Sequence, residues 1–155
     1  MLRRHQDRRK KTKATPNEAR HMSSDDYRSD LWILDLFGED QGYFDPCPFK
    51  GLDIGENGLA ENWLNWRRIY VNPPYSEPHK WVDKALESLF EANMRDQEIT
   101  IVMLLKHDSS TRWFRKLHEA GSHFLLISER LSYQTGKTAN FPSVLAVITN
   151  KGDVQ

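Results

Sequence analysis

The sequence lacks the marks of several large classes of protein. It contains a single cysteine, Cys47, so an internal disulfide bond is excluded and a reducing compartment is expected. No apolar run is long enough to span a bilayer, and the N-terminus has no signal-peptide stretch, so we expect a cytoplasmic location and no membrane partner. The six histidines form no HExxH motif, and we expect no metal site.

What the chain does contain is typical of one soluble globular domain. It is 155 residues long, 38% hydrophobic and 28% charged, with a formal net charge of zero. The charge is uneven, because residues 1–20 hold eight Arg and Lys residues against two acidic ones, and the remainder is acidic. We expect a basic, disordered arm at 1–24 and a single domain at 25–155. The arm either attracts a polyanion or is a solvated tail without a partner.

The apolar periodicity predicts strands that alternate with helices. Helices are expected over residues 24–37, 77–94 and 110–120. Strands are expected over residues 43–45, 68–72, 99–105, 123–128 and 144–149. The run ITIVMLL at 99–105 is apolar throughout, which is typical of a strand covered on both faces. The alternation predicts an α/β sheet with helices on both faces.

Two of the predicted connections are long. Residues 49–65 form a loop-rich segment, and Trp63 and the neighbouring Trp66 are expected to be core or wall residues. Residues 129–143 join the last two strands, and their length fits either a hairpin or a functional loop.

Three polar residues are expected at one edge of this sheet. Asp45, Asn72 and Lys106 each follow the end of a predicted strand. Ligands of open α/β sheets bind beyond the carboxyl ends of the strands. The sequence therefore predicts one site from these three positions.

The segment YVNPPYS, residues 70–76, is the most specific part of this site. A residue that precedes proline is restricted to extended backbone, so Asn72 and Pro73 are both stiffened. Neither Pro73 nor Pro74 has an N–H to compete for a partner. The segment presents an amide side chain, the Pro73 carbonyl and the Tyr75 ring, a set that suits an exocyclic amino group on a planar ring.

The chain resembles the phage-type DNA N6-adenine methyltransferases, the Dam-like family, over about residues 27–149. NPPY after a strand is the catalytic motif of methyltransferases that use S-adenosylmethionine to methylate amino groups. The resemblance rests on seven blocks in order: FDPCP (44–48), NGLAENW (57–63), YVNPPYS (70–76), KWVDKALE (80–87), LLKHDSSTRWF (104–114), ERLSY (129–133) and FPSVLAVI (141–148).

The resemblance implies a fold and a function. The fold is an α/β domain with a compact Rossmann-like methyltransferase sheet, flanking helices and a C-terminal antiparallel strand pair. The function is transfer of a methyl group from S-adenosylmethionine to the N6 amino group of adenine in DNA. It implies a prokaryotic host cell, with phage or prophage origin as one reading. Two alternatives stay open: methylation of RNA or of a protein glutamine, and a catalytically silent nucleic-acid-binding domain.

By the same resemblance, the catalytic residues are Asn72, Pro73, Pro74 and Tyr75. The Asn72 side-chain oxygen and the Pro73 carbonyl would each accept a hydrogen bond from the amino group, which favours a pyramidal, nucleophilic nitrogen. Tyr75 would stack on the base. A base inside a duplex cannot reach such a pocket, so it would be flipped out.

The donor-binding residues implied by the resemblance are Phe44, Asp45, Pro46, Cys47 and Asn57. The Asp45 carboxylate either pairs with the ammonium of S-adenosylmethionine or begins an Asp-Pro turn. The sequence departs from the family here, since it has no GxGxxG loop and carries Asn57 where an acidic residue is common. Asn57 therefore either contacts a ligand or forms a turn with the following glycine.

The substrate-binding residues implied are Lys106, Arg130 and Ser143. The pair that follows Lys106, His107 and Asp108, either lines the target pocket or caps the next helix. Arg112 and its neighbour Arg115 are expected on a solvated helix face.

Overall fold

The computed structural model describes residues 29–48, 57–132 and 138–152. The helices within them are α1 (Leu31–Phe37), α2 (Pro78–Met94) and α3 (Arg112–Glu119), with the short 3-10 helices η2 (Glu39–Gln41) and η3 (Trp63–Asn65). The strands are β1 (Arg68–Val71), β2 (Thr100–Lys106), β3 (His123–Leu126) and β4 (Ser143–Thr149). The expected arm at 1–24 lies outside the described residues.

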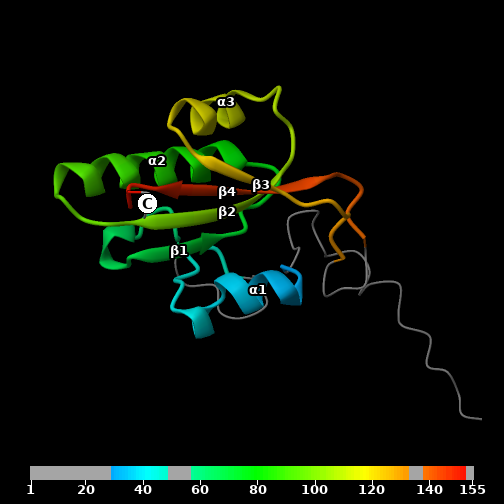
Figure 1. Cartoon of the computed structure of the whole chain (residues 1–155), viewed down its shortest axis with the longest axis horizontal. Coiled ribbons are helices and arrows are strands. Elements are labelled where there is room, and N and C mark those ends of the chain that lie inside the picture. The colour runs from blue at the N-terminus through cyan, green and yellow to red at the C-terminus, as the bar shows by residue number, and fades with distance from the viewer. Residues whose placement is uncertain (1–28, 49–56, 133–137, 153–155) are drawn as a thin grey trace, which may run out of the picture.

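The four strands form one mixed sheet in the order β1-β2-β4-β3 (Figure 1). β1 and β2 are parallel, with Arg68 opposite Thr100. β4 lies between β2 and β3 and is antiparallel to both. The expected antiparallel pair at the C-terminal end of the domain is therefore confirmed as β3 and β4.

Helices cover both faces of the sheet, as predicted. One face packs against α2 and α3 through a core that includes Trp81, Leu117 and Ile101. The other face packs against α1 through Ile33 and Tyr70. Figure 1 shows α2 and α3 on one side of the strands and α1 on the other. Every residue of β2 between its two ends is buried, which explains its unbroken apolar sequence.

Of the helix predicted at residues 24–37, the described part of the chain shows α1 from Leu31, because Ser29 and Asp30 are not helical. Asp30 is the N-cap, in extended backbone with φ −61° and ψ 145°. Residues 24–28 lie outside the described residues. The preceding Ser29 is buried, and its hydroxyl forms a hydrogen bond with the Tyr70 hydroxyl. This contact fixes the chain just before the helix.

The strand predicted at 43–45 is reduced to one parallel bridge, between Phe44 and Ile69 of β1. The Asp45 carboxylate accepts a hydrogen bond from the backbone N–H of Cys47, which turns the chain directly after the bridge. The strand predicted at 68–72 ends at Val71, and that at 123–128 ends at Leu126. These shifts move no predicted site residue to another part of the fold.

The long connection from β3 to β4 has the pairing of a hairpin. Ser132 and Thr138 form an antiparallel bridge, and the Ala139 N–H donates to the Leu131 carbonyl at 2.8 Å. The residues between them, 133–137, are outside the described part of the chain. Within that part, no helix combines the length and apolar character that crossing a bilayer requires.

Candidate active site

The NPPY segment forms the connection between β1 and α2. Asn72 directly follows the last residue of β1, and α2 begins at Pro78, where a proline is well tolerated because the first helical N–H has no intrahelical partner. The Pro74 carbonyl accepts from the Glu77 N–H at 3.3 Å and closes the turn. Among the described residues, none donates a backbone hydrogen bond to the Pro73 carbonyl. The turn, which lies within the described part of the chain, therefore makes no backbone hydrogen bond to the Pro73 carbonyl, which is the predicted acceptor.

The amide of Asn72 has a defined neighbour on its nitrogen side. Nδ2 donates to the Ser29 hydroxyl at 3.1 Å, and that hydroxyl lies 2.7 Å from the hydroxyl of Tyr70. Because nitrogen and oxygen lie on opposite sides of the amide carbon, the Asn72 oxygen faces away from Ser29.

An aromatic pair and a cation lie beside this segment. The Tyr75 ring meets the Phe141 ring edge to face, with centroids 4.7 Å apart and planes at 68°. The Lys106 ammonium lies 5.7 Å from the centroid of Phe141. Lys106 ends β2 and is the register partner of Ser143, which begins β4. Four residues from three separate segments therefore meet at one end of the sheet.

Ser143 is 1% exposed, and its hydroxyl has no hydrogen-bond partner among the described residues. A buried hydroxyl without a partner is costly. Ser143 lies opposite Lys106 in the register of β2 and β4, with its hydroxyl inside the protein, and its role in substrate binding stays a prediction.

The segment predicted to bind the methyl donor, S-adenosylmethionine, lies next to β1. Phe44 stacks on Trp66 with centroids 3.5 Å apart, and Asp45 Oδ1 accepts from the Cys47 N–H at 2.8 Å. Burial raises the pKa of Asp45 from 3.8 to about 6, against the lowering effect of the Cys47 hydrogen bond, and nearby Glu39 raises it further. Such a carboxylate gains from a cationic partner, because the partner offsets the loss of hydration.

Gly58 packs against the same segment, and Asn57 precedes it. Asn57 is exposed, and its side-chain oxygen accepts from the Leu59 N–H at 3.2 Å, which is the geometry of the expected turn. A Cβ on Gly58 would come within 1.7 Å of the Pro46 carbonyl oxygen. The Gly58 carbonyl in turn accepts from Trp63 Nε1 at 2.8 Å. Two predicted donor-binding segments are thus held in contact through a glycine.

His107 and Asp108 lie between the end of β2 and the start of α3. Asp108 accepts from the backbone and hydroxyl of Ser110, and these hydrogen bonds lower the pKa of Asp108. The N-cap itself is Thr111, whose hydroxyl accepts from the Phe114 N–H at 3.3 Å. The His107 ring stacks on Phe114. The cap of α3 is therefore Thr111 rather than His107 or Asp108, and Asp108 instead forms a turn with Ser110 before the helix.

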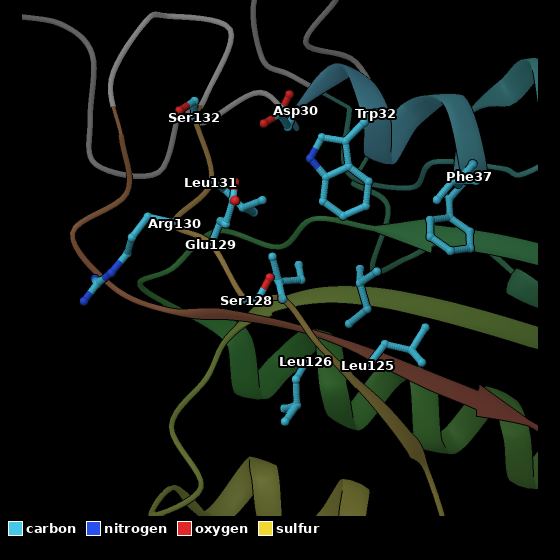
Figure 2. A pocket seen from close by; sticks show the side chains of 13 residues that line it. Asp30, Trp32, Phe37, Leu125, Leu126, Ser128, Glu129, Arg130, Leu131 and Ser132 are labelled. Carbon is cyan, nitrogen blue, oxygen red and sulfur yellow. The ribbon is translucent and has the colours of Figure 1, made fainter.

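Arg130 is exposed and lies elsewhere, at a pocket of about 510 Å³ between α1 and the chain that follows β3. Figure 2 shows Trp32 over this pocket and the Arg130 guanidinium directed away from its middle. None of the described residues Asn72, Tyr75 and Lys106 lines it. The structure therefore does not bring Arg130 into the same pocket as the NPPY segment.

Two residues of this site were not singled out by the sequence. Ser29 precedes α1 and has no motif around it. Phe141 belongs to the FPSVLAVI block, but its contact with Tyr75 depends on the place of β4 beside β2.

Trp63 is fully buried, as expected of a core residue. In the described ranges, no group of three His, Cys, Asp or Glu residues could hold a metal ion.

Comparisons with known proteins identify the family. The model of the DNA N-6-adenine-methyltransferase (Dam) family matches residues 5–151. A protein of Escherichia phage T1 named DNA N-6-adenine-methyltransferase is 33% identical over 76 residues, which are 49% of this chain and 29% of the relative. One of the same name from Haemophilus phage HP1 (strain HP1c1) is 39% identical over 59 residues, 38% of this chain and 31% of the relative.

The aligned part spans less than a third of the length of either relative. No solved structure matches the chain. The family match extends over nearly all of the sequence, including every segment that forms the site. The chain belongs to the DNA N-6-adenine-methyltransferase (Dam) family.

Proposed function

We propose that the protein transfers a methyl group from S-adenosylmethionine to the N6 amino group of adenine in DNA. The observation that carries this proposal is the Asn72 amide, which directly follows β1 with its nitrogen on Ser29 and its oxygen turned the other way. The adjacent Pro73 carbonyl accepts no backbone hydrogen bond from the described residues. Two acceptors side by side suit the two protons of an amino group.

In the proposed reaction, the main contribution of the protein is to position the adenine amino group against the methyl donor. S-adenosylmethionine supplies a methyl group on a positively charged sulfur, a good leaving group. The adenine nitrogen is a weak nucleophile because its lone pair is delocalised into the ring. Hydrogen bonds from its two N–H groups to the Asn72 side-chain oxygen and the Pro73 carbonyl localise that lone pair. Positive charge grows on the nitrogen as the N–C bond forms and the S–C bond breaks, so both dipoles stabilise the transition state more than the ground state. The methylated nitrogen then loses one proton to solvent, since the Asn72 amide and the Pro73 carbonyl accept hydrogen bonds but are too weakly basic to keep a proton.

The target base would rest against Tyr75. Its ring is held edge to face by Phe141, which restricts how it can turn. Lys106 lies over the Phe141 ring and supplies positive charge where a nucleotide phosphate would approach. We assign these residues to a base flipped out of the duplex.

Asp45 would hold the ammonium of S-adenosylmethionine. Its raised pKa reflects a carboxylate that has lost hydration, which fits a site for a cationic group. Phe44, Pro46, Cys47 and Asn57 complete the proposed donor wall, and the close approach of Gly58 to Pro46 supports this grouping.

The strand order supports a compact Rossmann-like sheet. β1 and β2 are parallel and have α2 between them in sequence, and Phe44 adds a parallel bridge on the outer side of β1. Asn72 and Lys106 both lie at the carboxyl ends of these parallel strands, where such sheets bind their ligands.

DNA is the proposed macromolecular partner, with the basic residues of the arm adding affinity for its backbone. We place the protein in the cytoplasm of a prokaryotic host. The two phage relatives support an origin in a phage or prophage.

The test is a transfer assay with S-adenosylmethionine labelled in the methyl group and three acceptors: DNA, RNA and protein. Label in DNA, recovered as N6-methyladenine after nuclease digestion and mass spectrometry, is the expected result. Label only in RNA or in protein glutamine would contradict the assignment of substrate. Donor binding without transfer to any acceptor would contradict the assignment of activity.

A further inference from the structure

A serine distant in sequence contacts the proposed catalytic amide. Ser29 is 6% exposed and lies 43 residues before Asn72. Its hydroxyl accepts from Asn72 Nδ2 at 3.1 Å and is 2.7 Å from the Tyr70 hydroxyl. Ser29, Tyr70 and Asn72 therefore form one short hydrogen-bonded chain at the end of β1.

The place of Ser29 is fixed by packing. It lies two residues before α1, whose Ile33 is fully buried on the same face of the sheet as Tyr70. The Phe37 ring of α1 stacks on the Tyr70 ring, with centroids 6.2 Å apart and planes within 7°. Ser29 and the Tyr70 hydroxyl that it contacts are thus anchored by the core that α1 covers.

Orientation matters for an asparagine that must act as an acceptor. The two ends of its amide are nearly equal in size, but one end accepts hydrogen bonds and the other donates them. A half-turn about the Cβ–Cγ bond would set the Asn72 NH₂ against an amino group, donor against donor. The proposed chemistry therefore needs something that distinguishes the two ends.

The hydroxyl of Ser29 can make this distinction when it donates to Tyr70. The two hydroxyls are 2.7 Å apart, and this contact is compatible with either one as the donor. A Ser29 hydroxyl that donates to Tyr70 can accept from Asn72 but cannot also donate to it, so a flipped amide would lose its bond. We propose that Ser29 donates to Tyr70 and is thereby a positioning residue that holds the Asn72 amide with its oxygen toward the target amino group. This inference rests on the proposed function of Asn72.

The first test compares Ser29→Ala with Ser88→Ala. Ser88 is a matched control, since it is 3% exposed and its hydroxyl donates one hydrogen bond, to the Lys84 carbonyl at 2.8 Å within α2. Ser29→Ala should lower kcat about tenfold, as expected for losing one hydrogen bond that sets an orientation. KM for DNA and for S-adenosylmethionine should stay within about twofold of wild type. A wild-type kcat in Ser29→Ala, or an equal loss in Ser88→Ala, would overturn the proposal.

The second test repeats Ser29→Ala in an Asn72→Asp background. A carboxylate presents oxygen on both sides, so it has no wrong orientation to prevent. The effect of Ser29→Ala on kcat, measured by single turnover with enzyme in excess over DNA, should shrink to about twofold or less there. A loss as large as in the Asn72 protein would mean that Ser29 acts only on the fold.

A third measurement does not depend on activity. The side-chain NH₂ signal of Asn72, assigned by its absence in Asn72→Asp, can be followed by ¹⁵N NMR. It should move in Ser29→Ala and stay in place in Ser88→Ala, and an unchanged signal in both would reject the contact. If wild type methylates no DNA, the proposed function fails, while this signal still reports on the role of Ser29.

Discussion

The Pro46 carbonyl oxygen lies so near Gly58 that a Cβ on that glycine would come within 1.7 Å of it. The contact joins the segment after Phe44 to the turn at Asn57, across residues that the structure does not describe. Both segments belong to the proposed donor wall, so a small change at Gly58 should disturb that wall.

We predict that Gly58→Ala destabilises the protein and weakens donor binding. The added methyl group meets backbone rather than a flexible side chain, so the two segments must separate, at a cost of about 1–3 kcal/mol. Gly152→Ala is the control, because a Cβ there meets nothing within 4 Å. Urea unfolding and calorimetry with S-adenosylmethionine would measure both effects. Equal midpoints and affinities in the two variants would contradict the close approach.

We predict that donor affinity falls as the pH drops from 7 to 5. Burial raises the pKa of Asp45 to about 6, so the carboxylate that would hold the ammonium becomes protonated within this range. Below pH 6 the dissociation constant should rise by up to about tenfold per pH unit. Asp45→Asn should bind weakly at both pH values and show a flat profile. The exposed Asp35→Asn should keep the wild-type profile, and a pH-independent wild type would remove Asp45 from the donor site.

We predict that Tyr75 acts through the face of its ring. Base–aromatic stacking contributes about 1–3 kcal/mol per base, so Tyr75→Ala should lose one to two decades of activity on DNA. Tyr75→Phe should retain most activity, and donor affinity should change little in either variant. Two equally inactive variants would assign the function to the hydroxyl instead. A fully active Tyr75→Ala would mean that the base rests elsewhere.

We predict that residues 1–20 supply most of the non-specific affinity for DNA. Removing them takes away eight basic residues and leaves an acidic remainder. Affinity for an unrelated duplex should fall and depend less on salt, because fewer counterions are released on binding. Binding curves measured at low and moderate salt by fluorescence anisotropy would test this. Curves that match those of the full chain would leave the arm as a passive tail.

Local sequence patterns predicted much of this fold. The unbroken apolar run at 99–105 predicted the burial of β2, and the strand expected at 68–72 is present as β1, which ends one residue earlier at Val71. These features depend on residues close together in the chain, which is why periodicity reveals them. The antiparallel pairing of β3 with β4 was expected from the resemblance to the family, since the residues alone left a hairpin or a functional loop open.

The features that the sequence did not reveal depend on contacts between distant segments. Ser29 reaches Asn72 only because α1 packs on the face that carries Tyr70, and Phe141 reaches Tyr75 only because β4 inserts beside β2. The short strand expected at 43–45 failed for a local reason, since Asp45 turns the chain toward Cys47. Arg130 belonged to a matching block, yet it lies at a different pocket.

The central claim is that the side-chain oxygen of Asn72 accepts a hydrogen bond from the amino group of adenine during methyl transfer. The most direct measurement is the rate of N6-methyladenine formation in DNA by wild type, Asn72→Ala and the exposed control Asn65→Ala, read by mass spectrometry. Losing one fixed dipole at the reacting group costs about a hundredfold or more in rate. Asn72→Ala should therefore lose at least that much while it keeps its melting temperature and donor affinity, and Asn65→Ala should match wild type. A near-normal rate in Asn72→Ala would contradict the account.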